Sequence, residues 1–429
     1  MDVSKSQLAK AVSRRGFLGA GGAAAALAIT GCKSGNMGGR SMGAVGSMGR
    51  RTSRMPPKEP DSRMMRAGGL TIRRRLFGFA PGGIRVDAYT VSNSRGGMVE
   101  FITYGARVAQ LHMPDRHGHS GDICLGYDHL KPYLNKDDPY FGATIGRVAN
   151  RIGHARFNVD GKTYHISVND NKINTLHGGL NAFDRQVWDA YVLHTHRGLG
   201  VRFKLFSPAM QNGFPGNLHV TADYVLTENN EILADLYAVT DQATPVNLTN
   251  HTYFNLRGPG HTIDHQLMTI YADYYTPVDK LLVPNGKLLP VAGTVLDFRH
   301  ATMIGKNIMK VPSPSNDRGY DHNYVIRHGG HGNVVKCAKA EDPHSGRVME
   351  VYTNQPGVQF YTGNFLNGTL HGIGGKYPYH GAFTLEPQDY PDAVNRPNFP
   401  SCILHPGQRY HEIIRYRFST TGRVHGANS

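Results

Sequence analysis

The sequence predicts an all-β fold, either a sandwich or a barrel. Apolar and polar residues alternate in residues 201–205, 231–239 and 409–418, as in strands with one buried face. Clusters of Gly, Pro, Asn and Asp separate such runs, whereas no segment keeps a helical period over three turns and no βαβ alternation occurs. About 350 residues can form one large β domain. The chain also lacks a glycine-rich dinucleotide fingerprint and a Walker loop, which disfavours nucleotide-dependent chemistry.

Residues 1–32 are predicted to be an export signal that takes no part in the fold. Arg14 and Arg15, followed by GFL, resemble a twin-arginine signal, and the Gly/Ala stretch after them is too short and too weakly apolar to span a bilayer. The tetrapeptide ITGC, which ends at Cys32, resembles a bacterial lipobox, in which the cysteine is lipidated. The alternative is an Ala-rich helix with an incidental cysteine. We expect export by the twin-arginine route and a lipoprotein of the bacterial periplasm or cell envelope.

Residues 33–68 are predicted to be a disordered linker. They are rich in Gly, Ser, Met and Arg and have no apolar period, so they cannot bury enough surface to offset the entropy lost on ordering. The chain has a net charge of +15, and residues 1–75 hold 15 Lys and Arg against 3 Asp and Glu, which leaves +3 for the remainder. Basic residues beside a lipid anchor suit an anionic membrane surface. No nucleic-acid partner is expected, because no aromatic residues or binding motif accompany the charge.

The cysteines give little information on redox state. Once Cys32 is assigned to the lipobox, Cys124, Cys337 and Cys402 remain, widely spaced and without a CxxC or other metal-binding pattern. We predict buried free thiols, and a single disulfide stays open as the alternative.

Three segments of the predicted folded domain, residues 69–425, combine an ionisable side chain with turn formers and aromatic residues. They are NTLHGGLNAFDRQVW around His177, VNLTNHTYFNL around His251 and FTLEPQDYPDAVN around Glu386. This mixture is expected where a sugar is bound and a proton is moved. Glu386 has apolar neighbours, among which a carboxylate is unusual without a function. Taken alone, His251 would more often be a hydrogen-bonded structural residue.

These segments closely resemble signatures of the aldose 1-epimerase, or galactose mutarotase, family. Further blocks resemble that family in the family's order: IGRVANRI, FPGNL, HQLMTIYADYYTPVD, GTVLDFR, YDHNYVI and QPGVQFYTGNFL. The resemblance implies a large antiparallel β-sandwich, often called a supersandwich, with the sugar in a cleft on one concave sheet.

The resemblance also implies an activity, the interconversion of the α and β anomers of free aldohexoses such as galactose and glucose. The sugar ring must open and reclose, which requires one base and one acid. By resemblance, Glu386 is the base, His251 the acid and His177 a supporting contact near the ring oxygen. The reaction needs neither a metal nor a redox cofactor, and the sequence signals neither.

Further residues are assigned to the sugar hydroxyls by resemblance: Asn150, Arg151, His177, Tyr253, Asp321 and Gln359. From the residues alone, Asp321 could instead close an Asx turn. Arg147 is expected to be either a buried ion-pair partner or a sugar contact. The turn at residues 210–213 and the stretch at 376–380 depart from the family pattern, which leaves the preferred sugar open.

Two other functions compete with this one. A relative acting on a hexose phosphate would need a cluster of arginines about the cleft. A non-catalytic sugar-binding lipoprotein on the same scaffold would not need both histidines and the glutamate, although a fold alone does not fix a function.

Overall fold

The structure, a computed structural model, describes residues 64–312, 318–330 and 332–422. Nearly all regular structure within these residues is strand, and the α-helix α1 (Leu130–Tyr133) is one turn long. None of the described helices has the length and apolar character that crossing a bilayer requires. The paired strands of the sheets described below run antiparallel, so the all-β prediction is confirmed.

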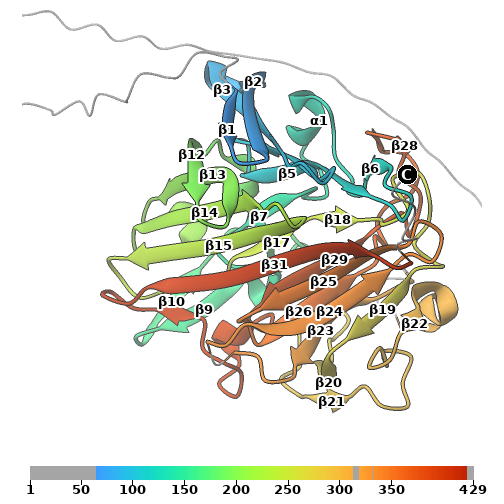
Figure 1. Cartoon of the computed structure of the whole chain (residues 1–429). Helices are drawn as coiled ribbons and strands as arrows, with labels where there is room; N and C mark the ends of the chain where they lie inside the picture. The colour runs from blue at the N-terminus through green and yellow to red at the C-terminus, as the bar shows by residue number, and fades with distance from the viewer. Residues whose placement is uncertain (1–63, 313–317, 331, 423–429) are drawn as a thin grey trace, which may run out of the picture. The chain divides into compact units, whose positions relative to one another are not determined.

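The largest sheet has nine strands and crosses the middle of the view in Figure 1. In spatial order they are β12 (Asp189–Thr195), β13 (Gly198–Ser207), β14 (Leu218–Leu226), β15 (Glu231–Thr240), β31 (Tyr410–Thr420), β25 (Arg347–Thr353), β24 (Val335–Glu341), β19 (Leu267–Ile270) and β22 (Thr302–Met303). The runs at 201–205, 231–239 and 409–418 that predicted strands lie in β13, β15 and β31.

Two six-stranded sheets accompany it. One consists of β1 (Met65–Ala67), β2 (Leu70–Ala80), β3 (Ile84–Ser92), β4 (Met98–Ile102), β5 (Arg107–Pro114) and β6 (Ser120–Asp122). The other consists of β18 (Tyr253–Phe254), β29 (Phe383–Gln388), β26 (Gly357–Tyr361), β23 (Asp321–Ile326), β20 (Ala272–Thr276) and β21 (Leu289–Pro290).

Short two-stranded ladders complete the topology. They pair β7 (Ala143–Ile145) with β17 (Thr249–His251), β8 (Arg151–Ile152) with β11 (Thr175–Leu176), β9 (Arg156–Val159) with β10 (Lys162–His165), β16 (Thr244–Pro245) with β30 (Ile403–Leu404), and β27 (His371–Gly372) with β28 (Gly375–Lys376).

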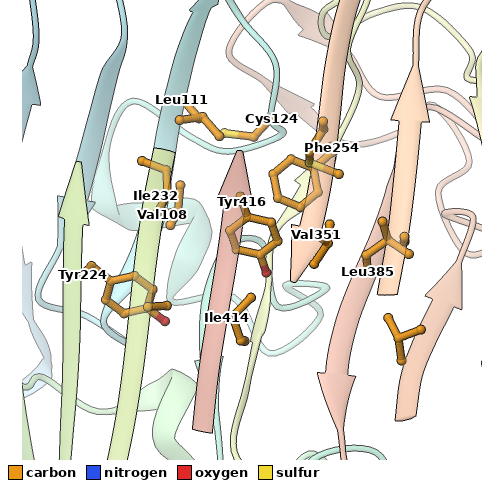
Figure 2. Close-up of a cluster of buried hydrophobic side chains, with 14 of the residues drawn as sticks. Val108, Leu111, Cys124, Tyr224, Ile232, Phe254, Val351, Leu385, Ile414 and Tyr416 are labelled. Carbon is orange, nitrogen blue, oxygen red and sulfur yellow. The ribbon is translucent and has the colours of Figure 1, made fainter. Parts of the chain in front are cut away.

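A continuous apolar core joins the three large sheets. Figure 2 shows part of this core. It includes Leu111 from β5, Val351 and Ile414 from the nine-stranded sheet, and Leu385 from β29. These four side chains are at most 2% exposed. Burial of this kind stabilises by about 25 cal/mol per Å² of apolar surface. Because successive side chains of a strand point to opposite faces, the inward Leu385 turns its neighbours Thr384 and Glu386 away from this core.

The folded region begins earlier than predicted. Residues 64–68 belonged to the predicted linker, yet Met65–Ala67 form β1, which pairs with β2 through a tight turn from Ala67 to Leu70. A strand of three residues is too short to show an apolar period, and the pairing with β2 is what orders it. The signal segment, Cys32 and the rest of the predicted linker lie outside the described residues, as do residues 423–425.

The three cysteines of the domain are free and buried, as predicted. Burial raises the pKa values of the Cys124, Cys337 and Cys402 thiols, so all three stay protonated and unreactive at neutral pH.

Candidate active site

Strand register places three of the predicted residues on one face of the six-stranded sheet that contains β29. Glu386 of β29 lies opposite Gln359 of β26, which lies opposite Asn323 of β23. Asp321 begins β23 two residues before Asn323, so its side chain shares this face. The three strands lie side by side in Figure 1. Side chains that are far apart in the sequence therefore meet.

His251 reaches the same place from another ladder. It ends β17, where it pairs with Ala143 of β7, and its Nε2 lies 3.4 Å from Oε1 of Glu386. His251 is 4% exposed and Glu386 is 1% exposed. A separation of 3.4 Å is longer than an N–H···O hydrogen bond. The two groups are thus neighbours in a dry site without being hydrogen-bonded to each other.

His177 follows the ladder of β8 and β11, in which Leu176 pairs with Arg151. Its backbone N–H donates to the carbonyl oxygen of Asn150, and its ring Nδ1 accepts a hydrogen bond from the N–H of Asn150 at 3.2 Å. Because Nδ1 is an acceptor, the ring hydrogen is on Nε2. The ring lies perpendicular to that of His251, with centroids 5.0 Å apart. His177 therefore offers an oriented donor beside the acid and base.

The glycines after His177 are required by the backbone. Gly178 has φ +88°, and a Cβ there would lie 2.1 Å from the carbonyl oxygen of Gly146. A side chain at this position would thus be excluded both by its conformation and by a clash. The close approach is to the backbone of the neighbouring segment, and it fixes where the His177 ring stands.

Burial shifts both titrating groups toward their neutral forms. It raises the pKa of Glu386 to about 8, with Asp321 acting in the same direction and Thr384 and Arg151 opposing it. Burial lowers the pKa of His251 to about 3. Between these values the pair holds one proton. In the neutral pair this proton is on Glu386, and in the reactive form it is on His251. The two forms have the same number of protons, so the change from one to the other requires no proton from solvent.

One potential metal-ligand atom from each of His177, His251 and Glu386 lies within 4.8 Å of the other two. Two imidazoles and a carboxylate at this spacing could also hold a metal ion. The same three groups can act as acid, base and donor without one.

An ionic network holds the hydroxyl-binding candidates. The Nε of Arg151 donates to Asp170 Oδ2 at 3.1 Å, and its Nη1 lies 3.9 Å from Asp321 Oδ2. Gln359 Nε2 donates to the other oxygen of Asp321 at 2.6 Å. Asp321 therefore serves this network, and no Asx turn forms at it. Arg151 and Asp321 thus place a cation and an anion beside each other, which suits hydroxyl groups, since each has one O–H donor and two acceptor lone pairs.

Asn150 and Tyr253, also assigned by resemblance, lie at the edges of this cluster. Asn150 adopts φ +58°, and its side-chain oxygen accepts a hydrogen bond from the N–H of Arg151 at 2.8 Å. Tyr253 is 2% exposed, and its ring centroid is 5.1 Å from that of His251. The Tyr253 ring packs against the imidazole and supports its position.

Sequence reasoning missed three residues of the site. The Tyr140 ring contacts both imidazoles, with centroids 4.8 Å from His177 and 5.8 Å from His251. Asp170 anchors Arg151, and Thr384 donates to Oε1 of Glu386. The position of Thr384 two residues before Glu386 in a strand was a usable signal, since such residues share a face. Tyr140 and Asp170 lie in turns and had no comparable signal.

Arg147 is buried, as one expectation had it, but it forms no ion pair among the described residues. Its guanidinium is buried and donates to carbonyl oxygens of Ser207, Pro208, Pro215 and Gly216 and to hydroxyls of Ser207 and Thr244. Burial lowers its pKa to about 10. Arg147 thus braces the turn at residues 210–213 through neutral acceptors.

The aromatic residues near the matched segments are mostly core. Trp188 is 2% exposed and donates its indole N–H to the carbonyl oxygen of Phe183, whose ring packs edge-on against it. Phe365, by contrast, is 53% exposed.

Asp389 and Glu412 are among the buried carboxyls outside the acid–base pair. Burial raises the pKa of Asp389 to about 7 and that of Glu412 well above its usual range. Glu412 accepts a hydrogen bond from the Tyr410 hydroxyl at 2.8 Å.

Comparisons with known proteins agree with this geometry. A family model described as aldose 1-epimerase matches residues 87–417. The chain is 44% identical to galactose mutarotase from Homo sapiens, over 81% of this chain and 99% of the relative. It is 35% identical to aldose 1-epimerase from Escherichia coli (strain K12), over 79% and 97% of the two chains. A crystal structure of galactose 1-epimerase from Lactobacillus acidophilus superposes with a TM-score of 0.72 at 28% identity, covering 82% of this chain and 100% of that one.

Proposed function

This chain belongs to the aldose 1-epimerase family, and from that membership we infer that it is a mutarotase, an isomerase that interconverts the α and β anomers of free aldohexoses such as galactose and glucose. The observation that carries the mechanism is the buried contact of 3.4 Å between His251 and Glu386, with His177 beside it. The full set of acid, base and oriented donor favours catalysis over sugar binding alone.

In the proposed mechanism the pair opens the ring by moving two protons. Glu386 takes the proton of the anomeric hydroxyl while His251 gives one to the ring oxygen. The bond between C1 and the ring oxygen breaks as the carbonyl forms, and the electron pair of that bond stays with the oxygen that His251 protonates. After rotation about the C1–C2 bond, the transfers reverse and the other anomer forms. General acid–base catalysis of this kind contributes about 10² to 10⁴ in rate.

His177 assists without changing its charge. Its Nε2–H is an oriented donor, and burial lowers its pKa well below the ordinary value, so the ring stays neutral. A neutral donor stabilises the negative charge that develops on the ring oxygen, while His251 remains the group that protonates this oxygen.

Arg151→Ala and Asp321→Asn are each expected to lower kcat/KM about tenfold, because each loses a charge-assisted contact to sugar hydroxyls or to its partner in the network. The His251–Glu386 pair stays intact in both variants. Full Michaelis curves on α-glucose and α-galactose measure the effect. Arg202→Ala is a matched control, since it breaks the Arg202–Asp223 ion pair on the nine-stranded sheet. Values of kcat/KM within twofold of wild type for both site variants would remove these positions from the site.

We further propose that the enzyme is exported by the twin-arginine route and anchored to the cell envelope by a lipid on Cys32. The supporting features are the twin arginines, the ITGC tetrapeptide and the basic segment that follows. A flexible chain of roughly 30 residues between Cys32 and β1 would span about 30 Å by random-coil scaling. Such a tether would hold the enzyme clear of the membrane surface.

Cys32→Ala is expected to release the enzyme from the membrane fraction with its specific activity unchanged, because no residue assigned to the site precedes residue 140. Fractionation of cells that produce wild type or the variant measures this, with a salt wash to remove electrostatic attachment. Ser34→Ala leaves the tetrapeptide intact and is the control. Wild type in the cytoplasm, or a Cys32→Ala protein that stays on salt-washed membranes, would contradict the proposal.

A further inference from the structure

The two carboxylate oxygens of Glu386 have different surroundings. Oε1 accepts a hydrogen bond from the Thr384 hydroxyl at 2.7 Å. Oε2 is buried, and no hydrogen bond to it forms among the described residues. Because the carboxylate group is rigid and planar, fixing one oxygen also fixes the direction of the other. The structure therefore contains one restrained oxygen and one free oxygen.

The restrained oxygen is also the one that faces the acid. The distance of 3.4 Å from His251 Nε2 runs to Oε1, the atom that Thr384 already holds. A carboxylate and an imidazolium in a dry site strongly favour a short, charge-assisted hydrogen bond of about 2.7 to 2.9 Å. Such a bond would direct the acid's proton at the base, so that neither group would be available to the sugar.

We propose that Thr384 is a positioning residue that keeps this acid and base apart. Its hydroxyl donates to Oε1 and holds that oxygen 3.4 Å from His251 Nε2, beyond hydrogen-bond length, while Oε2 stays free to take the proton of the anomeric hydroxyl. The inference rests on the proposed mutarotase function and adds to it the device that keeps the pair productive.

Local structure makes Thr384 suited to this task. Thr384 and Glu386 are two residues apart in β29 and so share a face, and a β-branched side chain has few χ1 rotamers. Thr384 is 0% exposed and is flanked by its register partners Tyr361 and Tyr253. It therefore cannot touch the sugar and acts only through Glu386.

Thr384→Val tests the proposal, because valine keeps the shape and removes the hydroxyl. We expect kcat to fall about tenfold, the value of one hydrogen bond to a charged group. KM should stay within about twofold, because the substitution leaves the residues that bind the sugar hydroxyls unchanged. Thr384→Ser restores the hydroxyl and is expected to recover most of kcat. If the valine variant does not fold, Thr384→Ala removes the same group and carries the same expectation.

Thr249→Val is the matched control. The Thr249 hydroxyl is equally buried and donates at 2.7 Å to the carbonyl oxygen of Pro387, directly after Glu386, without touching the carboxylate. This variant removes a hydrogen bond from β17 to β29, the strand that carries Glu386, and should leave kcat within about threefold of wild type. An equal loss of kcat in Thr249→Val and Thr384→Val would show general loosening and overturn the proposal.

A spectroscopic signature distinguishes the two roles further. In Thr384→Val the freed carboxylate should bond to His251, which produces a downfield imidazole N–H resonance in the proton spectrum. The resonance should be absent from wild type and should disappear in Thr384→Val/Glu386→Gln. An active wild type with an unchanged Thr384→Val variant refutes only the positioning role. A wild type that does not exceed the spontaneous rate refutes the mutarotase function itself.

Discussion

Glu386→Gln is expected to lower kcat by a factor of about 10² or more, because an amide has the shape of the carboxyl but cannot accept a proton. The loss should be the same for glucose and galactose, since anomeric proton removal is common to both. Polarimetry of freshly dissolved α-glucose and α-galactose, corrected for the spontaneous rate, measures it. Circular dichroism should show an intact fold.

Glu412→Gln is the matched control for this variant. Glu412 is also fully buried, and burial raises its pKa, but it accepts a hydrogen bond from Tyr410 in β31. The control should retain kcat within a few-fold, whereas Glu386→Gln should not. Near-normal rates in Glu386→Gln would end the assignment of Glu386 as the base.

The pH dependence of wild type tests the same residue. The pair holds one proton below the raised pKa of Glu386 of about 8 and loses it above that value. Without this proton His251 cannot act as acid, so activity should be level near neutrality and fall above about pH 8. The residual rate of Glu386→Gln should lack this alkaline decline.

His251→Ala is expected to cost a factor of about 10² or more in kcat, because the ring oxygen would leave as an unprotonated alkoxide. His177 cannot replace it, since its Nδ1 is held by Asn150 and burial keeps its ring neutral. The loss should appear in kcat more than in KM, because Arg151 and Asp321 still hold the hydroxyls.

His112→Ala serves as the control for that variant. His112 is a partly buried histidine of β5, in the sheet that begins with β1. A rate for His251→Ala close to that of His112→Ala would show that His251 is not the acid and would require a different proton donor.

The sequence was sufficient for the fold class, and it supplied the residues that we propose carry the chemistry. Alternation predicted β13, β15 and β31 because each has one buried face. Glu386, His251 and Arg151 were assigned through resemblance. Strand register explains why Glu386 meets Gln359 and Asp321, whereas His251 and Arg151 come from the ladders of β17 and β8. Tyr140 and Asp170 could not be predicted, because turn residues have no period and their partners are distant in the chain. The partners of Arg147 could not be predicted, because most of its acceptors are backbone carbonyls that any sequence supplies.

The buried carboxyls Glu386, Asp389 and Glu412 have a consequence for the durability of the enzyme. Their pKa values in the folded protein lie above the ordinary values of 3.8 for Asp and 4.5 for Glu. Stability from such groups is complete below the ordinary pKa and is lost as the pH rises through the folded values, here from about 7 to 8 for Asp389 and Glu386. Acidic surroundings would therefore favour this fold, and alkaline surroundings would ionise carboxyls that are buried away from solvent.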